Sequence, residues 1–154
     1  MSSLVAFNTL LIPIDFSDTS REAFLQAEAL LAGEEPSLIA LHVIDTGLVD
    51  LLQASGVEDV EQQVATLRKN LEQKLTEFTA LERSDVVISR VICVGTPFLE
   101  ILHKATDFAV DAIVMGKVGN GDRFEQLLFG STAEHVLRAS ACPVIVFPRP
   151  LPGH

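Results

Sequence analysis

The sequence predicts an α/β protein built on an open, five-stranded parallel sheet with helices on both faces. Two observations support this fold class. Apolar runs of strand length alternate along the chain with stretches whose apolar residues recur every three or four positions. The apolar runs are also almost continuously hydrophobic, which is typical of parallel strands covered on both faces. Because 154 residues with 48% apolar content suffice for one core, we expect a single domain over residues 1–154.

Five apolar runs are predicted to be strands. They span Thr9–Ile14, Leu38–Ile44, Val86–Val94, Ala112–Met115 and Pro143–Phe147. Pro13 has no N–H to donate to a ladder, so the first strand should end there. The last strand should lie at an edge of the sheet.

Helices are predicted between these runs. The first should begin at a cap formed by Ser17, Asp18 or Thr19 and end at Gly33. The stretch from Thr46 to Gly56 is predicted to be irregular. The later helices are expected over residues 60–78, from Thr96-Pro97 to about Phe108, and over 131–139. Ser131 and Glu134 have the spacing of a capping box, which predicts Ser131 as the helix cap.

Charge and composition exclude several classes of protein. The formal net charge is −10, and residues 1–77 carry 4 basic and 13 acidic side chains. Such a surface repels a phosphate backbone, so nucleic acid is not an expected partner. No apolar run has the length of a membrane span, and the first residues lack the basic start of a signal peptide. We therefore expect no membrane association.

The two cysteines, Cys93 and Cys142, lie in apolar, β-branched surroundings. We interpret them as buried free thiols in a reducing compartment, which predicts a cytoplasmic protein. His42 lies within an apolar strand and is interpreted as a packed core residue. His103 and His135 fall on helices without the spacing of metal ligands, so no metal site is predicted.

The stretch from Asp111 to Glu134 carries the strongest functional pattern. A short strand leads into a segment with glycines at Gly116, Gly119 and Gly121, and Gly130 then precedes the hydroxyls of Ser131 and Thr132 at the start of a helix. Glycines let backbone N–H groups approach an anion, and a helix start adds unpaired donors and a favourable dipole. This pattern is typical of a phosphate site, although the glycines could equally form only a flexible turn.

Two common phosphate loops are absent from the sequence. No Gly-Lys-Ser/Thr occurs, so there is no P-loop. The first strand is followed by DFSDTS rather than by the glycine fingerprint of dinucleotide-binding proteins.

Taken together, these motifs resemble the universal stress protein family. They are PID at the end of the first strand, LHVI in the second, VGTP after the third, and G-x-x-G followed by GST and HVLRASACPVIVF. The resemblance extends from Leu11 to Phe147. It implies a Rossmann-like fold, similar to adenine nucleotide alpha hydrolases, with strand order 3-2-1-4-5. It also implies a homodimer and, in one branch of the family, ATP as ligand, with Mg²⁺ held through the phosphates as an option.

The resemblance assigns roles to individual residues. Asp15 would accept a ribose hydroxyl, Pro13 and Met115 would flank the adenine, and Val43 would meet its edge through backbone groups. Gly116, Gly119 and Gly130 would let the backbone approach the triphosphate, and Ser131 and Thr132 would donate to it. Lys117 and Arg123 could add positive charge, although the family pattern does not require either at these positions. For Asp15, a role limited to capping or to a turn is the alternative.

One departure from the family pattern leaves two functions open. Ten residues separate Gly119 from Gly130, whereas the ATP-binding branch has nine. The extra residue, placed near Asn120–Gly121, can displace the donors that must converge on the phosphates. The first hypothesis is an ATP-binding stress-response regulator with at most slow hydrolysis. The second is a dimeric interaction module of the same fold without nucleotide. An ATP-consuming enzyme is disfavoured because no catalytic base or metal site can be identified.

Overall fold

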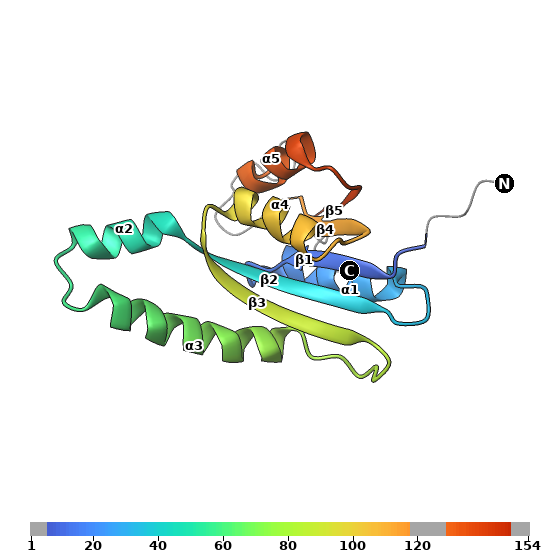
Figure 1. Cartoon of the computed structure of the whole chain (residues 1–154), viewed down its shortest axis with the longest axis horizontal. Helices are drawn as coiled ribbons and strands as arrows, with labels where there is room; N and C mark the ends of the chain where they lie inside the picture. The colour runs from blue at the N-terminus through green and yellow to red at the C-terminus, as the bar shows by residue number, and fades with distance from the viewer. Residues whose placement is uncertain (1–5, 118–128, 149–154) are drawn as a thin grey trace.

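The computed structural model describes residues 6–117 and 129–148, and within them helices flank a parallel sheet (Figure 1). In chain order the elements are β1 (Thr9–Pro13), α1 (Asp18–Leu30), β2 (Ser37–Asp45), α2 (Thr46–Ala54), α3 (Val60–Phe78), β3 (Val87–Gly95), α4 (Pro97–Asp107), β4 (Ala112–Gly116), α5 (Ser131–Ala139) and β5 (Val144–Phe147). Each predicted strand is present and differs from its predicted bounds by at most one residue at either end.

The five strands are parallel and lie in the order β3-β2-β1-β4-β5, as predicted. β1 is central, and its whole length from Thr9 to Pro13 pairs with β2. The chain builds one half of the sheet from β1 to β3 and then crosses to the other side of β1 with β4. The strand order therefore reverses between β1 and β4, the position at which open α/β sheets form a crevice beyond the strand ends.

Apolar residues of the sheet alternate between two cores, one on each face. On one face, Leu10 of β1 packs with Phe24 of α1 and Leu75 of α3. On the other face, Leu11 packs with residues of α4 and with Val136 of α5. Because successive side chains of a strand point to opposite faces, neighbouring residues of β1 serve different cores. Helices on both faces explain why the strands are apolar throughout.

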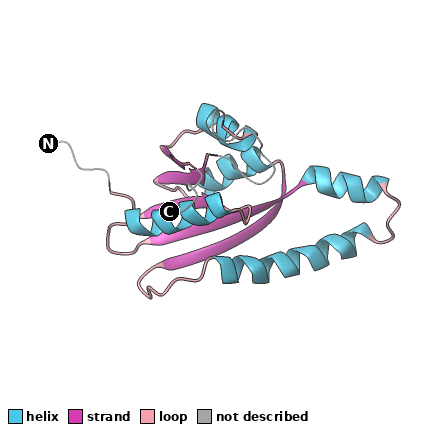
Figure 2. Ribbon diagram, turned by 180° about the vertical axis from the view of Figure 1, so that it is seen from behind, coloured by secondary structure: helices cyan, strands magenta, loops and turns pink. Residues whose placement is uncertain are grey.

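The prediction of an irregular segment at residues 46–56 was wrong, because residues 46–54 form α2. The Asp45 side chain accepts a hydrogen bond of 2.8 Å from the Gly47 N–H and so caps the helix start. After Ser55, Gly56 turns the chain with a φ of +76°, a conformation suited to glycine. α2 has no buried residue, and with α3 it forms a hairpin that extends beyond the body of the protein (Figure 2).

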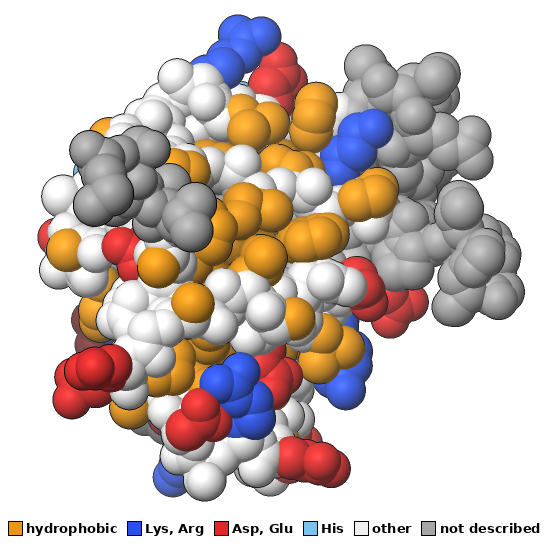
Figure 3. Space-filling view, turned by 90° about the vertical axis from the view of Figure 1, so that its right-hand side faces the viewer, with side chains coloured by type: hydrophobic (Ala, Val, Ile, Leu, Met, Phe, Trp, Pro, Cys, Tyr) orange, Lys and Arg blue, Asp and Glu red, His pale blue; other side chains and the backbone are white. Residues whose placement is uncertain are grey.

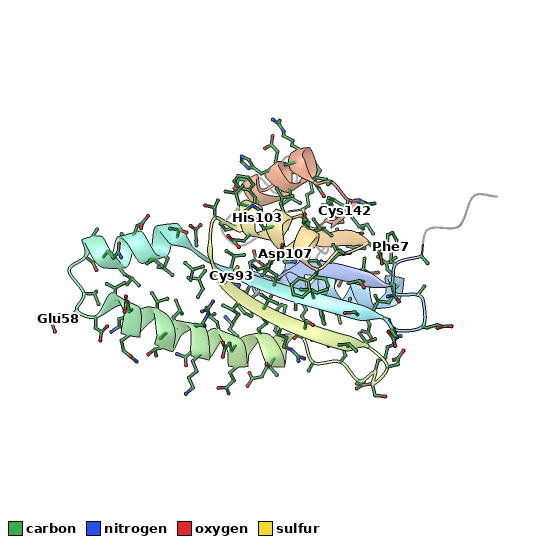
Figure 4. All side chains as sticks on the ribbon, viewed as in Figure 1. Phe7, Glu58, Cys93, His103, Asp107 and Cys142 are labelled. Carbon is green, nitrogen blue, oxygen red and sulfur yellow. The ribbon has the colours of Figure 1, made fainter. Side chains whose placement is uncertain are left out.

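The cysteines differ from the prediction of buried core residues. Cys93 on β3 and Cys142 before β5 are both free and only partly buried. They lie on separate elements, as Figure 4 shows. Both contact the core between the sheet and helices α4 and α5 from its margin. The reason is their position, since β3 and β5 are the two edge strands of the sheet.

The surface combines many charged side chains with some uncovered apolar ones. Figure 3 shows the molecule from the side opposite to the tip of the α2–α3 hairpin, with hydrophobic side chains across the middle of this face and most charged ones nearer its rim. Among the helices described, none combines the length and the hydrophobicity needed to cross a bilayer.

Candidate functional site

A cavity of about 240 Å³ lies at the carboxyl ends of the central strands. Its walls come from the ends of β1, β2 and β4 and from the starts of α1, α4 and α5, so it occupies the crevice where the strand order reverses. The residues that line it are Pro13, Ile14, Asp15, Ser17, Ser20, Leu41, His42, Val43, Pro97, Ile101, Met115, Gly116, Lys117, Gly130, Ser131, Thr132 and Ala133.

The loop from β1 to α1 forms one wall of this cavity. Ser17 is the cap of α1, and its hydroxyl accepts a 3.1 Å hydrogen bond from the Ser20 N–H. The backbone N–H of Ser17 donates to Asp15 Oδ1 at 3.0 Å, and its hydroxyl donates to the same oxygen. Asp15 therefore does form a turn, which was the alternative reading of this residue. Asp15 is nevertheless exposed and lines the cavity, and a carboxylate can accept more than two hydrogen bonds.

β2 contributes two neighbouring residues with different roles. The His42 Nδ1 lies 2.7 Å from the Ile14 carbonyl oxygen, and because a carbonyl only accepts, Nδ1 carries the proton. The Leu41 carbonyl accepts from the Ile14 N–H at 2.7 Å, just beyond the end of β1. Backbone hydrogen-bonding direction alternates along a strand, so Val43 turns its polar backbone groups to the same side as Leu41, where β1 has ended. His42 is half-buried beside the cavity rather than enclosed in the core.

The end of β4 approaches α1 closely at Gly116. A Cβ atom placed on Gly116 would lie 2.3 Å from Thr19 Cγ2 and 3.1 Å from Thr19 Cβ. Contacts under 3.0 Å do not occur for real side chains, so packing against α1 alone requires glycine here. Lys117 follows, with its Nζ 5.3 Å from the centre of the Phe129 ring, a cation–π distance.

The start of α5 corrects the predicted helix cap. Gly130, not Ser131, is the cap, and no side chain makes a capping hydrogen bond. The Glu134 N–H bonds to the Gly130 carbonyl at 3.0 Å, so Glu134 is the fourth residue of the helix, one residue beyond the capping-box position. Its carboxylate pairs instead with Arg138 at 2.8 Å. The Gly130 N–H donates to the Lys117 carbonyl at 2.9 Å. The N–H groups of residues 131–133 precede the first intrahelical donor and face the cavity end of α5.

The structure brings eight of the nine predicted binding residues to this one cavity. They are Pro13, Asp15, Val43, Met115, Gly116, Gly130, Ser131 and Thr132. The predictions for Gly119, Gly121 and Arg123, and the extra residue near Asn120–Gly121, lie outside the described residues. That these residues bind a ligand stays a prediction.

Sequence reasoning missed several residues that line the cavity, among them Pro97, Ile101 and Ser20. Pro97 could have been found, because it begins the helix after the third strand and so lies at the carboxyl edge of the sheet. The described residues contain no cluster of three or more His, Cys, Asp or Glu side chains that could hold a metal ion.

A five-stranded parallel sheet whose switch point forms a cavity of apolar and polar residues, walled by a helix start, defines a class of α/β proteins that bind small ligands there. The model of the universal stress protein family matches residues 6–148 of this chain. The chain belongs to this family.

Individual relatives agree with this assignment. The universal stress protein MJ0577 of Methanocaldococcus jannaschii is 32% identical, covering 94% of this chain and 97% of that protein. The universal stress protein YxiE of Bacillus subtilis is 26% identical, covering 91% and 98%. The solved structure of MJ0577 has a TM-score of 0.78 at 29% identity, covering 96% and 99%. A universal stress protein in complex with cAMP has a TM-score of 0.59 at 21% identity, covering 94% and 99%, which shows a shared fold.

Proposed function

We propose that this chain is an ATP-binding universal stress protein that acts as a stress-response regulator in the cytoplasm. The observation that carries the proposal is the convergence of Asp15, Met115, Gly116 and the start of α5 on one cavity at the switch point of the sheet. Asp15 and Ser131, the first residue of α5, are 116 positions apart in the chain. The residues that meet at the cavity include groups suited to the base, the ribose and the phosphates of a nucleotide. A relative of the same fold was solved in complex with cAMP, an adenine nucleotide.

The chemistry of the cavity fits an adenosine moiety. Pro13 and Met115 supply apolar surface from adjacent strands for the faces of the base. Val43 offers backbone groups beyond the end of β1, suited to the hydrogen-bonding edge of the base. Asp15 offers a carboxylate for the ribose hydroxyls, because such an acceptor binds two neighbouring hydroxyl donors well.

Phosphates would lie at the start of α5. There the N–H groups of Ser131, Thr132 and Ala133 point out of the first helical turn, and the helix dipole favours negative charge. The hydroxyls of Ser131 and Thr132 add donors, and the Lys117 ammonium adds positive charge beside them. This half of the chain is also the less acidic, with 7 basic and 8 acidic side chains over residues 78–154. Magnesium, where it takes part, would be held through the phosphates.

A dimeric interaction module without nucleotide is the second candidate function. Two observations favour it: packing against Thr19 already accounts for Gly116, and the Lys117 carbonyl already accepts from the Gly130 N–H. The ten-residue spacing between Gly119 and Gly130 also favours the module without nucleotide, because it departs from the pattern of the ATP-binding branch.

Both candidates are single-domain, non-enzymatic proteins that form homodimers through β5. β5 lies at the edge of the sheet and leaves one row of backbone groups unpaired by β4. A second copy pairing with this edge around a two-fold axis would satisfy these groups. Sedimentation at micromolar concentration that gives only monomer would exclude this assembly. Nucleic acid and membranes are not proposed as partners.

The proposal is tested by denaturing the purified protein, assaying released nucleotide, and titrating ATP by calorimetry. Gly130→Val is the informative variant, because Gly130 is buried with φ −62° and ψ 155°, a backbone conformation that valine adopts without strain. We expect ATP binding in the parent and its loss in this variant. Glu58→Gln, at the tip of the α2–α3 hairpin (Figure 4), is the distant control and should bind like the parent. No binding by the parent at millimolar ATP would favour the interaction module.

A further inference from the structure

Phe16, the residue between Asp15 and the cap of α1, has a backbone conformation that side-chain-bearing residues rarely adopt. Its φ is +66°, in the left-handed region. Among the described residues, Asp59 and Ala109 also have positive φ. Ala109 follows the end of α4, where such values are common, and Asp59 is the cap at the start of α3. Phe16 instead lies in the loop that forms a wall of the cavity. A strained residue at such a place persists only when its surroundings hold it.

The Phe16 ring is held by three side chains from β2 and α3. It lies 4.9 Å from the His42 ring and 5.3 Å from the Phe78 ring in an edge-to-face arrangement. The Lys74 ammonium lies 4.3 Å from its centre, within the range of a cation–π interaction. The Phe78 ring is itself packed beneath the Arg21 guanidinium, 5.6 Å away. The ring is therefore fixed against the core on the α3 face of the sheet and does not itself line the cavity.

The backbone on both sides of Phe16 is fixed as well. Ile14 donates its N–H to Leu41 and accepts from His42 through its carbonyl. Ser17 caps α1 and donates twice to Asp15 Oδ1. With Ile14 and Ser17 fixed, the left-handed turn at Phe16 sets the direction in which the Asp15 carboxylate leaves the loop.

We propose that Phe16 is a positioning residue for ribose recognition: anchored by His42, Lys74 and Phe78, its ring holds the strained turn that aims Asp15 into the cavity. The inference rests on the proposed nucleotide site. It adds that α3, a helix that contributes no residue to the cavity, controls ribose selectivity through Phe16.

The test compares ATP with 2′,3′-dideoxyATP, which lacks both ribose hydroxyls, by calorimetric titration of the parent and of variants. Hydrogen bonds to a charged acceptor predict that the parent prefers ATP by about 10- to 100-fold. Phe16→Ala and Phe78→Ala should bring this preference down to about threefold or less, and Asp15→Asn should do the same. The Kd of dideoxyATP should stay within about threefold of the parent value in each variant. Because a general loss of stability weakens both ligands alike, the ratio separates positioning from a structural role.

Phe7→Ala is the matched control. Phe7 also packs against the core beside α1, but it lies at the opposite end of the sheet from the cavity, near the start of β1 (Figure 4). The Phe7→Ala variant should prefer ATP over dideoxyATP as strongly as the parent does. If Phe16→Ala does not fold, Phe78→Ala decides, since it removes one of the ring's anchors and leaves the loop sequence intact.

Three results would overturn the inference in distinguishable ways. An unchanged preference in the Phe16 and Phe78 variants, with the parent selective, would reject positioning and leave the nucleotide site in place. An equal loss of preference in Phe7→Ala would assign the effect to general destabilisation. If the parent binds neither nucleotide, the proposed function itself fails, and the role of Phe16 fails with it.

Discussion

Replacing Gly116 with alanine should destabilise the protein even when no ligand is present. The new Cβ would lie 2.3 Å from Thr19 Cγ2, 3.1 Å from Thr19 Cβ and 3.4 Å from the Thr19 carbonyl carbon. Thr19 is only 2% exposed, and Ala23 and Phe24 bury the same helix against the sheet, so the side chain cannot simply rotate away. α1 or β4 must shift. Overpacking of this kind costs about 1–3 kcal/mol, and we expect the upper half of that range because backbone must move.

A double-mutant cycle separates this contact from other effects. Thr19→Ser removes Cγ2, after which the nearest remaining Thr19 contact would be at 3.1 Å. Gly116→Ala alone should lower the Tm by about 4–12 °C in differential scanning calorimetry, given roughly 2–4 °C per kcal/mol at this chain length. In the Thr19→Ser background the loss should be about 1–2 kcal/mol smaller. A neutral Gly116→Ala, or strictly additive effects, would refute the packing explanation for this glycine.

Three further predictions follow from individual contacts. Leu75→Ala should lower the free energy of unfolding in urea by about 2–5 kcal/mol, because Leu75 is fully buried. Leu51→Ala on α2 should change it by less than about 0.5 kcal/mol, since Leu51 is 65% exposed. Equal effects of the two substitutions would contradict the assigned packing. Phe16→Gly should be more stable than Phe16→Ala by roughly 1 kcal/mol, because only glycine adopts a φ of +66° without cost. This reverses the usual order, in which alanine is the more stabilising residue. A more stable alanine variant would argue against the left-handed turn. Burial and, after it, the negative charge of Glu100 raise the pKa of the Cys93 thiol, whose Sγ lies 3.7 Å from Glu100 Oε2. Glu100→Gln in a Cys142→Ser background should therefore speed alkylation of Cys93 at pH 8. An unchanged or slower rate would contradict a contribution of the Glu100 charge to this pKa.

The strands could be predicted from the sequence because burial on both faces leaves an almost uninterrupted apolar run. The long helix α3 was equally predictable, since Val60, Val64, Leu67 and Leu71 recur at helical spacing and lead to the buried Leu75. The order of the strands came from the family resemblance, because apolar runs carry no information about which strands are neighbours.

The errors have physical causes that are visible in the structure. α2 was missed because Thr46 and Gly47 favour irregular structure, although Asp45 is a good cap and Leu48, Leu51 and Leu52 recur at helical spacing. The cap of α5 was placed one residue late, because a hydroxyl is a better cap than glycine on local preferences alone. The close approach between Gly116 and Thr19 joins positions almost 100 residues apart, which no local pattern reveals.

Most polar groups around the cavity already form hydrogen bonds within the protein, so few donors remain for binding a phosphate. The Gly130 N–H is taken by the Lys117 carbonyl, the His42 Nδ1 proton by the Ile14 carbonyl, and the Ser17 donors by Asp15. Within the described part of the chain, the donors best placed for an anion are therefore the N–H groups in the first turn of α5.

A phosphate held there would depend on the direction of the helix rather than on any one side chain. Exchanging Ser131 or Thr132 for alanine removes a hydroxyl but leaves the N–H groups and the helix dipole in place. Helix direction is in turn set by Ala133 and Val136, which are buried against the sheet on the face shared with α4. Packing at the back of α5 thus determines the geometry of its binding end, and the same relation between a packed side chain and a polar group in the cavity holds for Phe16 and Asp15.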